Sequence, residues 1–125
     1  DVEPLDILKR YRNHWGDLSP SELWCAVTTD TVFRMPMLEM ADAAVRGGAI
    51  VRTYVFSHVS SGLGGALGAG HATEIPYVFD NLGLPGTELM LGSIDDARRS
   101  FASDLADCWV AFASDRELRA ATLLR

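Results

Sequence analysis

The feature that most constrains the fold is a short apolar run followed by a glycine-rich loop that ends in a histidine. Residues 50–56 read Ile-Val-Arg-Thr-Tyr-Val-Phe. So short a run of β-branched and aromatic residues predicts a buried strand. Residues 57–70 contain five glycines, and His71 follows them directly. This order predicts that a flexible loop carries the imidazole to the end of a sheet.

Strong helix signals precede the predicted strand. Residues 4–11 have the spacing of a short amphipathic helix, and residues 14–17 predict a break after it. A new helix is expected after Ser19, because a serine followed three residues later by Glu22 is the pattern of a capping box. The same helix should place Leu23, Trp24 and Val27 on one apolar face.

This helix and a later one have clear boundaries in the sequence. Pro36 lacks an amide hydrogen and predicts a kink or a restart, and Gly47-Gly48 predicts the C-terminal stop. A further helix is expected to open at residues 93–96, where acidic residues occupy the first turn. Its buried stripe is predicted to consist of Ile94, Ala97, Phe101, Leu105, Cys108, Trp109 and Phe112.

Composition narrows the possible classes of function. The 125 residues suit one domain, and the formal net charge of −6 argues against a nucleic-acid surface. No apolar run reaches the length of a membrane span. Cys25 and Cys108 have no metal-ligand spacing, so we expect them to be reduced and buried, which favours the cytoplasm. Three scattered histidines make a poor metal site, and no cofactor is expected.

The residues around His71 resemble a known motif. Gly68-x-x-His71-x-x-Glu74-Ile-Pro-Tyr-Val-Phe79 is similar to the C-terminal histidine motif of the type-B carboxylesterase and cholinesterase family. The run Trp109-x-x-Phe112-Ala113 is also similar to that family. The resemblance extends from about Ser19 to Ala113. It implies the C-terminal part of an α/β-hydrolase fold, mostly helical with one or two strands, in which residues 1–125 form a single incomplete segment.

The resemblance also implies a function. The family hydrolyses carboxylic esters with a Ser-Glu-His triad, and His71 matches its general base. Glu74 matches a carboxylate that hydrogen-bonds around the site without being the triad acid. The family's Gly-x-Ser-x-Gly nucleophile motif is absent from these residues. The chain by itself is therefore expected to be inactive. Its expected partners are a small ester substrate and either the missing N-terminal part of the hydrolase or a second copy, with no nucleic acid and no membrane.

Plainer interpretations stand beside these. A single histidine is usually structural, and Glu74 could serve only as a local cap for the turn before Pro76. The aromatic residues Tyr77, Phe79, Trp109 and Phe112 are expected in the core. The alternative function is a non-catalytic, truncated or pseudo-esterase segment that acts as a binding module.

Overall fold

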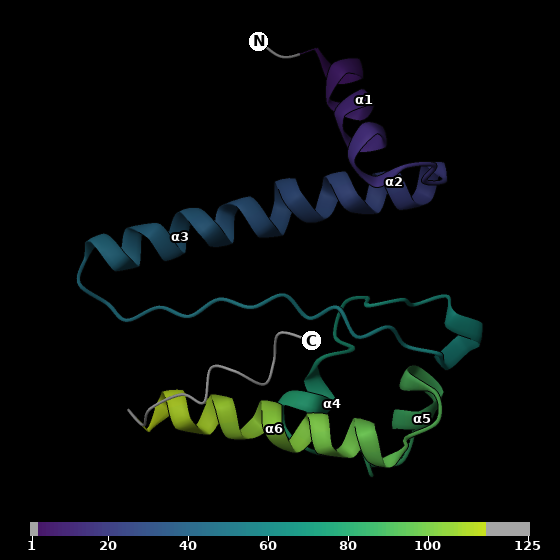
Figure 1. Ribbon diagram of the computed structural model, residues 1–125, viewed down its shortest axis with the longest axis vertical. Helices are drawn as coiled ribbons and strands as arrows, with labels where there is room; N and C mark the ends of the chain where they lie inside the picture. Colours follow the sequence, from purple (N-terminus) through teal and green to yellow (C-terminus); the bar gives the residue numbers. More distant parts are fainter. Residues whose placement is uncertain (1–2, 115–125) are drawn as a thin grey trace. The chain divides into compact units, whose positions relative to one another are not determined.

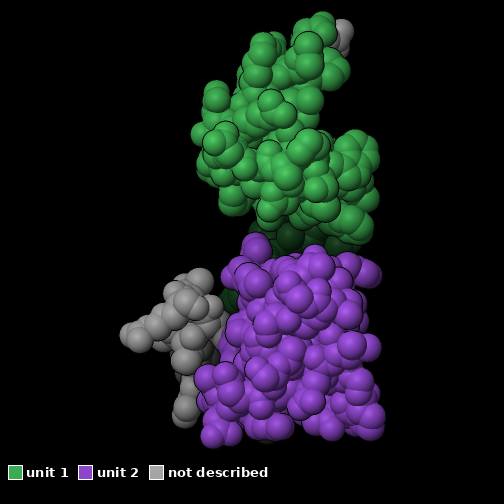
Figure 2. Space-filling view, turned by 90° about the vertical axis from the view of Figure 1, so that its right-hand side faces the viewer, with its two compact units in different colours: residues 1–54 green, residues 55–125 purple. Residues whose placement is uncertain are grey.

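The computed structural model describes residues 3–114, and these divide into two compact units (Figures 1 and 2). The first unit ends at Tyr54 and the second begins at Val55. The predicted mostly helical character is confirmed, since helices make up nearly all the regular structure of the described part.

The first unit begins with helix α1, Pro4–Trp15. The helix extends past Tyr11 to Trp15 and ends at Gly16, within the break that the sequence predicted at residues 14–17. There φ is +77° and the amide donates to the Arg12 carbonyl at 2.9 Å. A positive φ with a ψ of −149° is a conformation that glycine adopts at the lowest cost, so the helix stops there.

Helix α2, Pro20–Thr28, starts where the sequence predicted. The Glu22 amide donates to Ser19 Oγ at 3.3 Å, and the Ser19 amide donates to Glu22 Oε2 at 2.9 Å, which completes the capping box. Of its predicted apolar face, Leu23 is buried, whereas the Trp24 side chain is 71% exposed. α1 packs against α2.

Pro36 is accommodated by a change of helix type. A π-helical segment, Thr29–Arg34, leads into helix α3, Met35–Arg46, and α2 and α3 lie along one rod in Figure 1. The Met35 amide donates to the Asp30 carbonyl, five residues back. The wider turn lies immediately before a proline that could not donate to the carbonyl four residues behind it. The predicted restart at Pro36 is thus confirmed, and α3 ends at Gly47 as expected.

The predicted strand at residues 50–56 is wrong. These residues form no regular element, and within residues 3–114 the only β-type pairing is an isolated bridge between Ser60 and Gly68. A strand is defined by hydrogen bonds to a neighbour, and no other segment of the described chain supplies them to residues 50–56. The side chains of Ile50 and Val55 are accordingly 67% and 70% exposed.

The second unit contains short helices around a small core. Its elements are the 3₁₀ helix η2, Gly62–Gly65, then α4, Ile75–Val78, α5, Thr87–Leu91, and α6, Asp96–Ala113. α6 begins after Asp95, whose Oδ1 accepts the Arg98 amide at 2.8 Å. α4 packs on α6, and α5 packs on η2.

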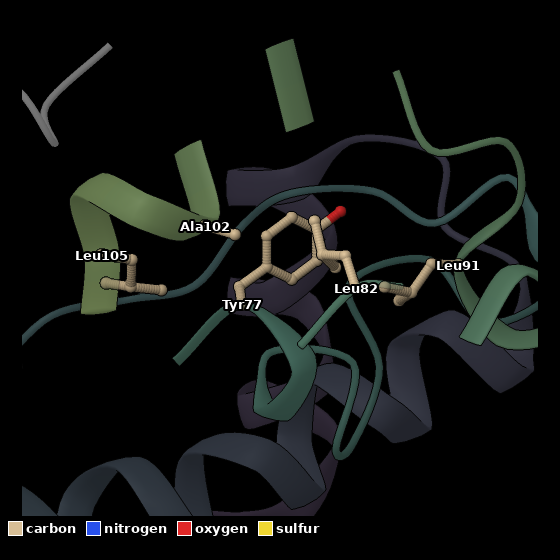
Figure 3. Packing of buried hydrophobic residues seen from close by; sticks show 5 residues of the cluster. All are labelled: Tyr77, Leu82, Leu91, Ala102 and Leu105. Carbon is tan, nitrogen blue, oxygen red and sulfur yellow. The ribbon is translucent and has the colours of Figure 1, made fainter. Parts of the chain in front are cut away.

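The core of the second unit centres on Tyr77. Figure 3 shows its ring among the side chains of Leu82, Leu91, Ala102 and Leu105, all of them buried. The core was expected to hold three more aromatic residues. Instead Phe79 is 70% exposed at the end of α4, and Trp109 and Phe112 are partly exposed towards the end of α6.

Two smaller expectations concern the cysteines. Both are free thiols, as predicted. Cys25 is exposed, however, and only Cys108 is partly enclosed, so the expectation that both are buried was wrong. Burial raises the pKa of the Cys108 thiol, and the carboxylates of Asp104 and Asp107 add to the effect because they oppose a thiolate.

Candidate active site

The His71 side chain is exposed at the corner of a tight turn. The Thr73 amide donates to the Gly70 carbonyl at 3.2 Å, which makes His71 and Ala72 the central residues of a β-turn. Ala72 has a φ of +68°. A left-handed conformation costs a residue with a Cβ roughly 1–2 kcal/mol, so the surrounding structure must hold the turn in place.

Contacts on both sides of His71 hold this turn. The Thr73 side chain is 1% exposed, and its Oγ1 donates to the Gly70 carbonyl at 2.7 Å. A side chain at Gly70 would place its Cβ 2.5 Å from the Leu67 carbonyl oxygen, so glycine is required there. The Ile75 amide donates to the Ala72 carbonyl at 3.3 Å and joins the turn to α4. His71 is therefore presented to solvent by a backbone that is fixed at both ends.

The loop before His71 is closed at its base. The Ser60 amide donates to the Gly68 carbonyl at 2.9 Å, so residues 61–67 form a loop whose two ends are joined by a hydrogen bond. Ser60 is 2% exposed, and its Oγ donates to the Met90 carbonyl at 2.5 Å and accepts the Gly62 amide at 3.0 Å. The glycine-rich loop is thus attached to α5. Nothing in the sequence indicated this role for Ser60.

Glu74 lies at the start of α4. Its backbone carbonyl accepts the amides of Tyr77 and Val78, each at 3.0 Å. Its side chain is half-buried and makes no hydrogen bond to the α4 backbone, so it is not a side-chain cap. Among the described residues the structure does not join the Glu74 carboxylate to His71 by a hydrogen bond or an ion pair.

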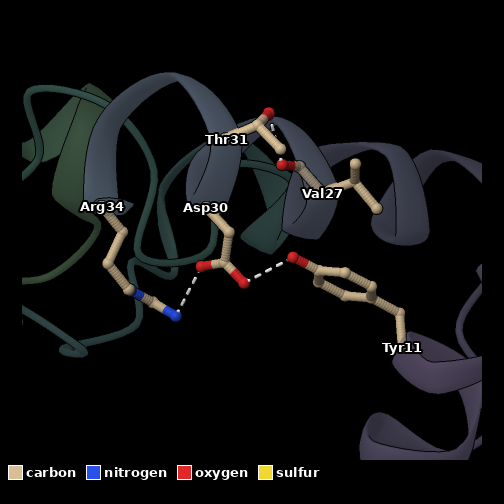
Figure 4. A network of polar contacts seen from close by, with 5 residues as sticks. All are labelled: Tyr11, Val27, Asp30, Thr31 and Arg34. Carbon is tan, nitrogen blue, oxygen red and sulfur yellow. Dashed lines mark hydrogen bonds and ion pairs between the residues drawn. The ribbon is translucent and has the colours of Figure 1, made fainter. Parts of the chain in front are cut away.

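A second polar cluster lies in the first unit (Figure 4). Tyr11 donates to Asp30 Oδ2 at 2.7 Å, and Arg34 Nη1 lies 2.7 Å from Asp30 Oδ1 as an ion pair. The Oδ1 contact is close but lacks hydrogen-bond alignment. Thr31 Oγ1 donates to the Val27 carbonyl at 2.8 Å. The hydrogen bond to Asp30 raises the pKa of Tyr11, and a small desolvation and the carboxylate charge act in the same direction.

Asp30 and Arg34 of this cluster line an open groove between α1 and the rod of α2 and the π segment. The groove residues are Trp15, Leu18, Glu22, Cys25, Ala26, Thr29, Asp30 and Arg34. No histidine lines it, so the groove lacks the base that the motif around His71 provides. Nor does the described part of the chain contain a group of three or more His, Cys, Asp or Glu side chains suited to a metal ion. None of the helices within residues 3–114 has the length and hydropathy of a membrane span.

The model of the carboxylesterase family matches residues 11–117, which is most of the chain and includes the whole His71 motif. The chain belongs to the carboxylesterase family. Membership supports an esterase-like hydrolase at the level of the family and indicates the α/β-hydrolase fold.

Proposed function

We propose that His71 is the general base of a carboxylic ester hydrolase. The observation that carries the proposal is an exposed histidine fixed at a strained turn, within a motif that lies inside the family match. A neutral imidazole in such a position is open to a hydroxyl that approaches from another part of the protein. The serine and the triad glutamate would come from polypeptide outside residues 1–125.

The chemistry needs a base at this place. A serine hydroxyl attacks an ester carbonyl efficiently only when a neighbouring base accepts its proton. The imidazolium that forms then protonates the departing alcohol, and the neutral ring next activates the water that cleaves the acyl-enzyme. The carboxylate on the other ring nitrogen holds the tautomer. The backbone hydrogen bonds of Thr73 and Ile75 would keep the imidazole in the same position while the acyl-enzyme forms and while it is cleaved.

Glu74 has a supporting role in this proposal. Its place three residues after His71, half-buried at the start of α4, suits a carboxylate that orders polar groups near the nucleophile. It does not suit the triad acid, because Glu74 is only three residues from His71 and, within residues 3–114, no hydrogen bond or ion pair joins its carboxylate to the imidazole.

The proposed partner is the remaining part of the hydrolase. Apolar side chains without a cover in the described chain support this proposal, among them Ile50, Val55 and Val59, which are 62–70% exposed. Burying such side chains stabilises an assembly by about 25 cal/mol for each Å² of apolar surface. The same exposure also favours the alternative of a non-catalytic binding segment, and it favours pairing with a second copy of the chain. The cytoplasmic location stays a prediction.

One complementation experiment tests the base and the partner together. The chain is combined with, or joined to, upstream sequence that contains a Gly-x-Ser-x-Gly motif, and hydrolysis of p-nitrophenyl esters is measured. The combination is expected to turn over, and the chain alone is not. His71→Ala should reduce kcat at least about a hundredfold, the usual minimum for the loss of a general base.

The control is His14→Ala, which removes an exposed histidine of α1 and should keep the full rate. Wild-type rates from the His71→Ala combination would refute the assignment. An upstream reading frame with no Gly-x-Ser-x-Gly would favour the non-catalytic alternative.

A further inference from the structure

Four rings of the second unit form one cluster that the esterase proposal does not use. They belong to Phe56, His58, Tyr77 and Phe101. The ring centroid of His58 lies 5.3 Å from that of Tyr77 and 5.7 Å from that of Phe101. Phe56 lies 5.3 Å from Tyr77 and 6.1 Å from Phe101. An imidazole thus occupies a position in an aromatic core that joins residues 56–58 to α4 and α6.

Two polar atoms are enclosed in this cluster without partners. Within the described residues, neither His58 Nε2 nor Tyr77 Oη makes a hydrogen bond, and both are shielded from solvent. An enclosed neutral nitrogen carries a moderate penalty. An enclosed imidazolium N–H with no acceptor carries a much larger one, because the charge loses its hydration as well. The cluster therefore favours the neutral ring.

The charges around His58 reinforce this preference. They come from the start of α6, where Arg98 Nη1 donates to the Leu91 carbonyl at 2.7 Å and to the Ser93 carbonyl at 2.8 Å. These bonds hold the guanidinium near His58. Asp95 supplies an opposing negative charge. Burial lowers the pKa of His58, Arg98 lowers it further, and Asp95 offsets only part of the shift. From α4, the side chain that faces His58 is Tyr77, whose own pKa is raised by burial.

We propose that His58 is a proton-sensitive latch, whose neutral ring closes the aromatic cluster and whose protonated ring must leave it. The latch lies two residues before Ser60, which fixes the glycine-rich loop to α5. Release of His58 would free the chain entering that anchor and loosen the base of the loop. The inference does not depend on ester hydrolysis, since it concerns the folding of the second unit alone.

The direction of the pH effect follows from the two states. The unfolded chain binds a proton at His58 near the ordinary value of 6.5, and the folded chain binds it only at lower pH. Above that value both states are neutral and the full stability is present. As the pH falls through 6.5, the unfolded state is protonated first, so stability is lost until the folded pKa is reached. Titration of carboxylates acts mainly at lower pH.

The experiment uses the complete 125-residue chain. Urea unfolding is measured between pH 8 and pH 5 for the wild type, for His58→Phe and for the control His14→Asn. The wild type and the control should lose stability across this range. His58→Phe keeps a ring in the cluster and removes the titrating group. The midpoint of its urea unfolding should therefore change much less with pH. A His58→Phe midpoint that falls as steeply as that of the wild type would overturn the proposal.

A second measurement needs no variant to fold. The imidazole carbon signals of His58 are followed by NMR in the native chain and in the same chain unfolded in urea. The native titration midpoint should lie at lower pH than the unfolded one. Equal midpoints would overturn the latch. A higher native midpoint would overturn it as well, because it would mean that the neighbouring rings stabilise the imidazolium by cation–π contact.

Discussion

The two units of this chain form helices in different ways. In the first unit, local signals define long helices: a capping box at Ser19, a proline at position 36 and a glycine stop at Gly47. Leu23 is nevertheless its only buried large apolar side chain among the described residues. In the second unit α4 and α5 span only four and five residues, yet they contribute Tyr77 and Leu91 to a core that Leu82 and two residues of α6, Ala102 and Leu105, complete.

The difference separates two sources of helical stability. Isolated helices of fewer than about 12–15 residues are marginal in water, so α4 and α5 depend on the packing of their buried face. The rod from Pro20 to Arg46 is long enough to form from local preferences, and its exposed apolar side chains contribute little to it. The second unit should therefore respond strongly to core substitutions, and the first mainly to changes at its helix ends.

The largest expected effect is at the centre of the second core. Tyr77→Ala should lower the free energy of unfolding by about 3–5 kcal/mol, because it removes a ring that is 1% exposed and leaves a cavity. Urea unfolding monitored by circular dichroism measures the change. The matched control in the first unit is Trp24→Ala, a larger ring that is 71% exposed and should cost less than about 0.5 kcal/mol. Similar losses for both variants would remove the distinction between the units.

An intermediate effect is expected where the glycine-rich loop meets α5. A Cβ at Gly62 would overlap the Met90 carbonyl, which belongs to the backbone and cannot move aside as a side chain would. Gly62→Ala should therefore cost about 1–3 kcal/mol by overpacking. Gly83→Ala is the control, since a Cβ there meets open space and φ is not positive. Thermal unfolding compares the two; a Gly62→Ala protein as stable as Gly83→Ala would show that this contact is not tight.

The smallest expected effect tests how strongly the helices of the first unit depend on their caps. Ser19→Ala removes the three hydrogen bonds of the Ser19 hydroxyl at the start of α2, with Ser21 Oγ, Glu22 Oε2 and the Glu22 amide, and should cost about 1 kcal/mol. Because little packing supports α2, the helical signal in circular dichroism should fall before global unfolding. Asp95→Ala removes the equivalent cap of α6, where Leu105 is buried, and should leave more of the helical signal intact. The opposite ranking would contradict the comparison.

Local sequence was enough to predict what local interactions decide. The capping box, the change at Pro36, the stop at Gly47 and the start of α6 each depend on residues within one helical turn. The position of His71 after a glycine-rich loop was also visible, and the resemblance of its motif to the carboxylesterases agrees with the family match. The turn that presents the ring was not visible, because nothing in the sequence indicated a positive φ at Ala72.

The expectations that were wrong concern contacts between residues that are distant in the sequence. Residues 50–56 have the composition of a strand, but composition cannot supply the neighbouring backbone that a strand requires. The core was only partly predicted for a similar reason: Phe79 and Tyr77 are two residues apart, and only Tyr77 meets α6. The role of His58 was missed as well. A signal did exist, since Phe56 and His58 alternate in the way that places side chains on one side of an extended backbone.

The π-helical segment at residues 29–34 has a consequence for how insertions and deletions would act on this chain. Each residue of an α-helix advances the side chains by about 100° around the axis, and a π turn carries an additional residue without the same advance along it. Removing one residue here would restore an ordinary α-helix and leave the flanking helices at nearly the same angle about the axis. Removing one residue from α3 would instead rotate everything before it by about 100°, and Leu23 would then face a different direction relative to the rest of α3. The π segment is thus the part of the rod that tolerates the loss of a residue without a change of angular phase.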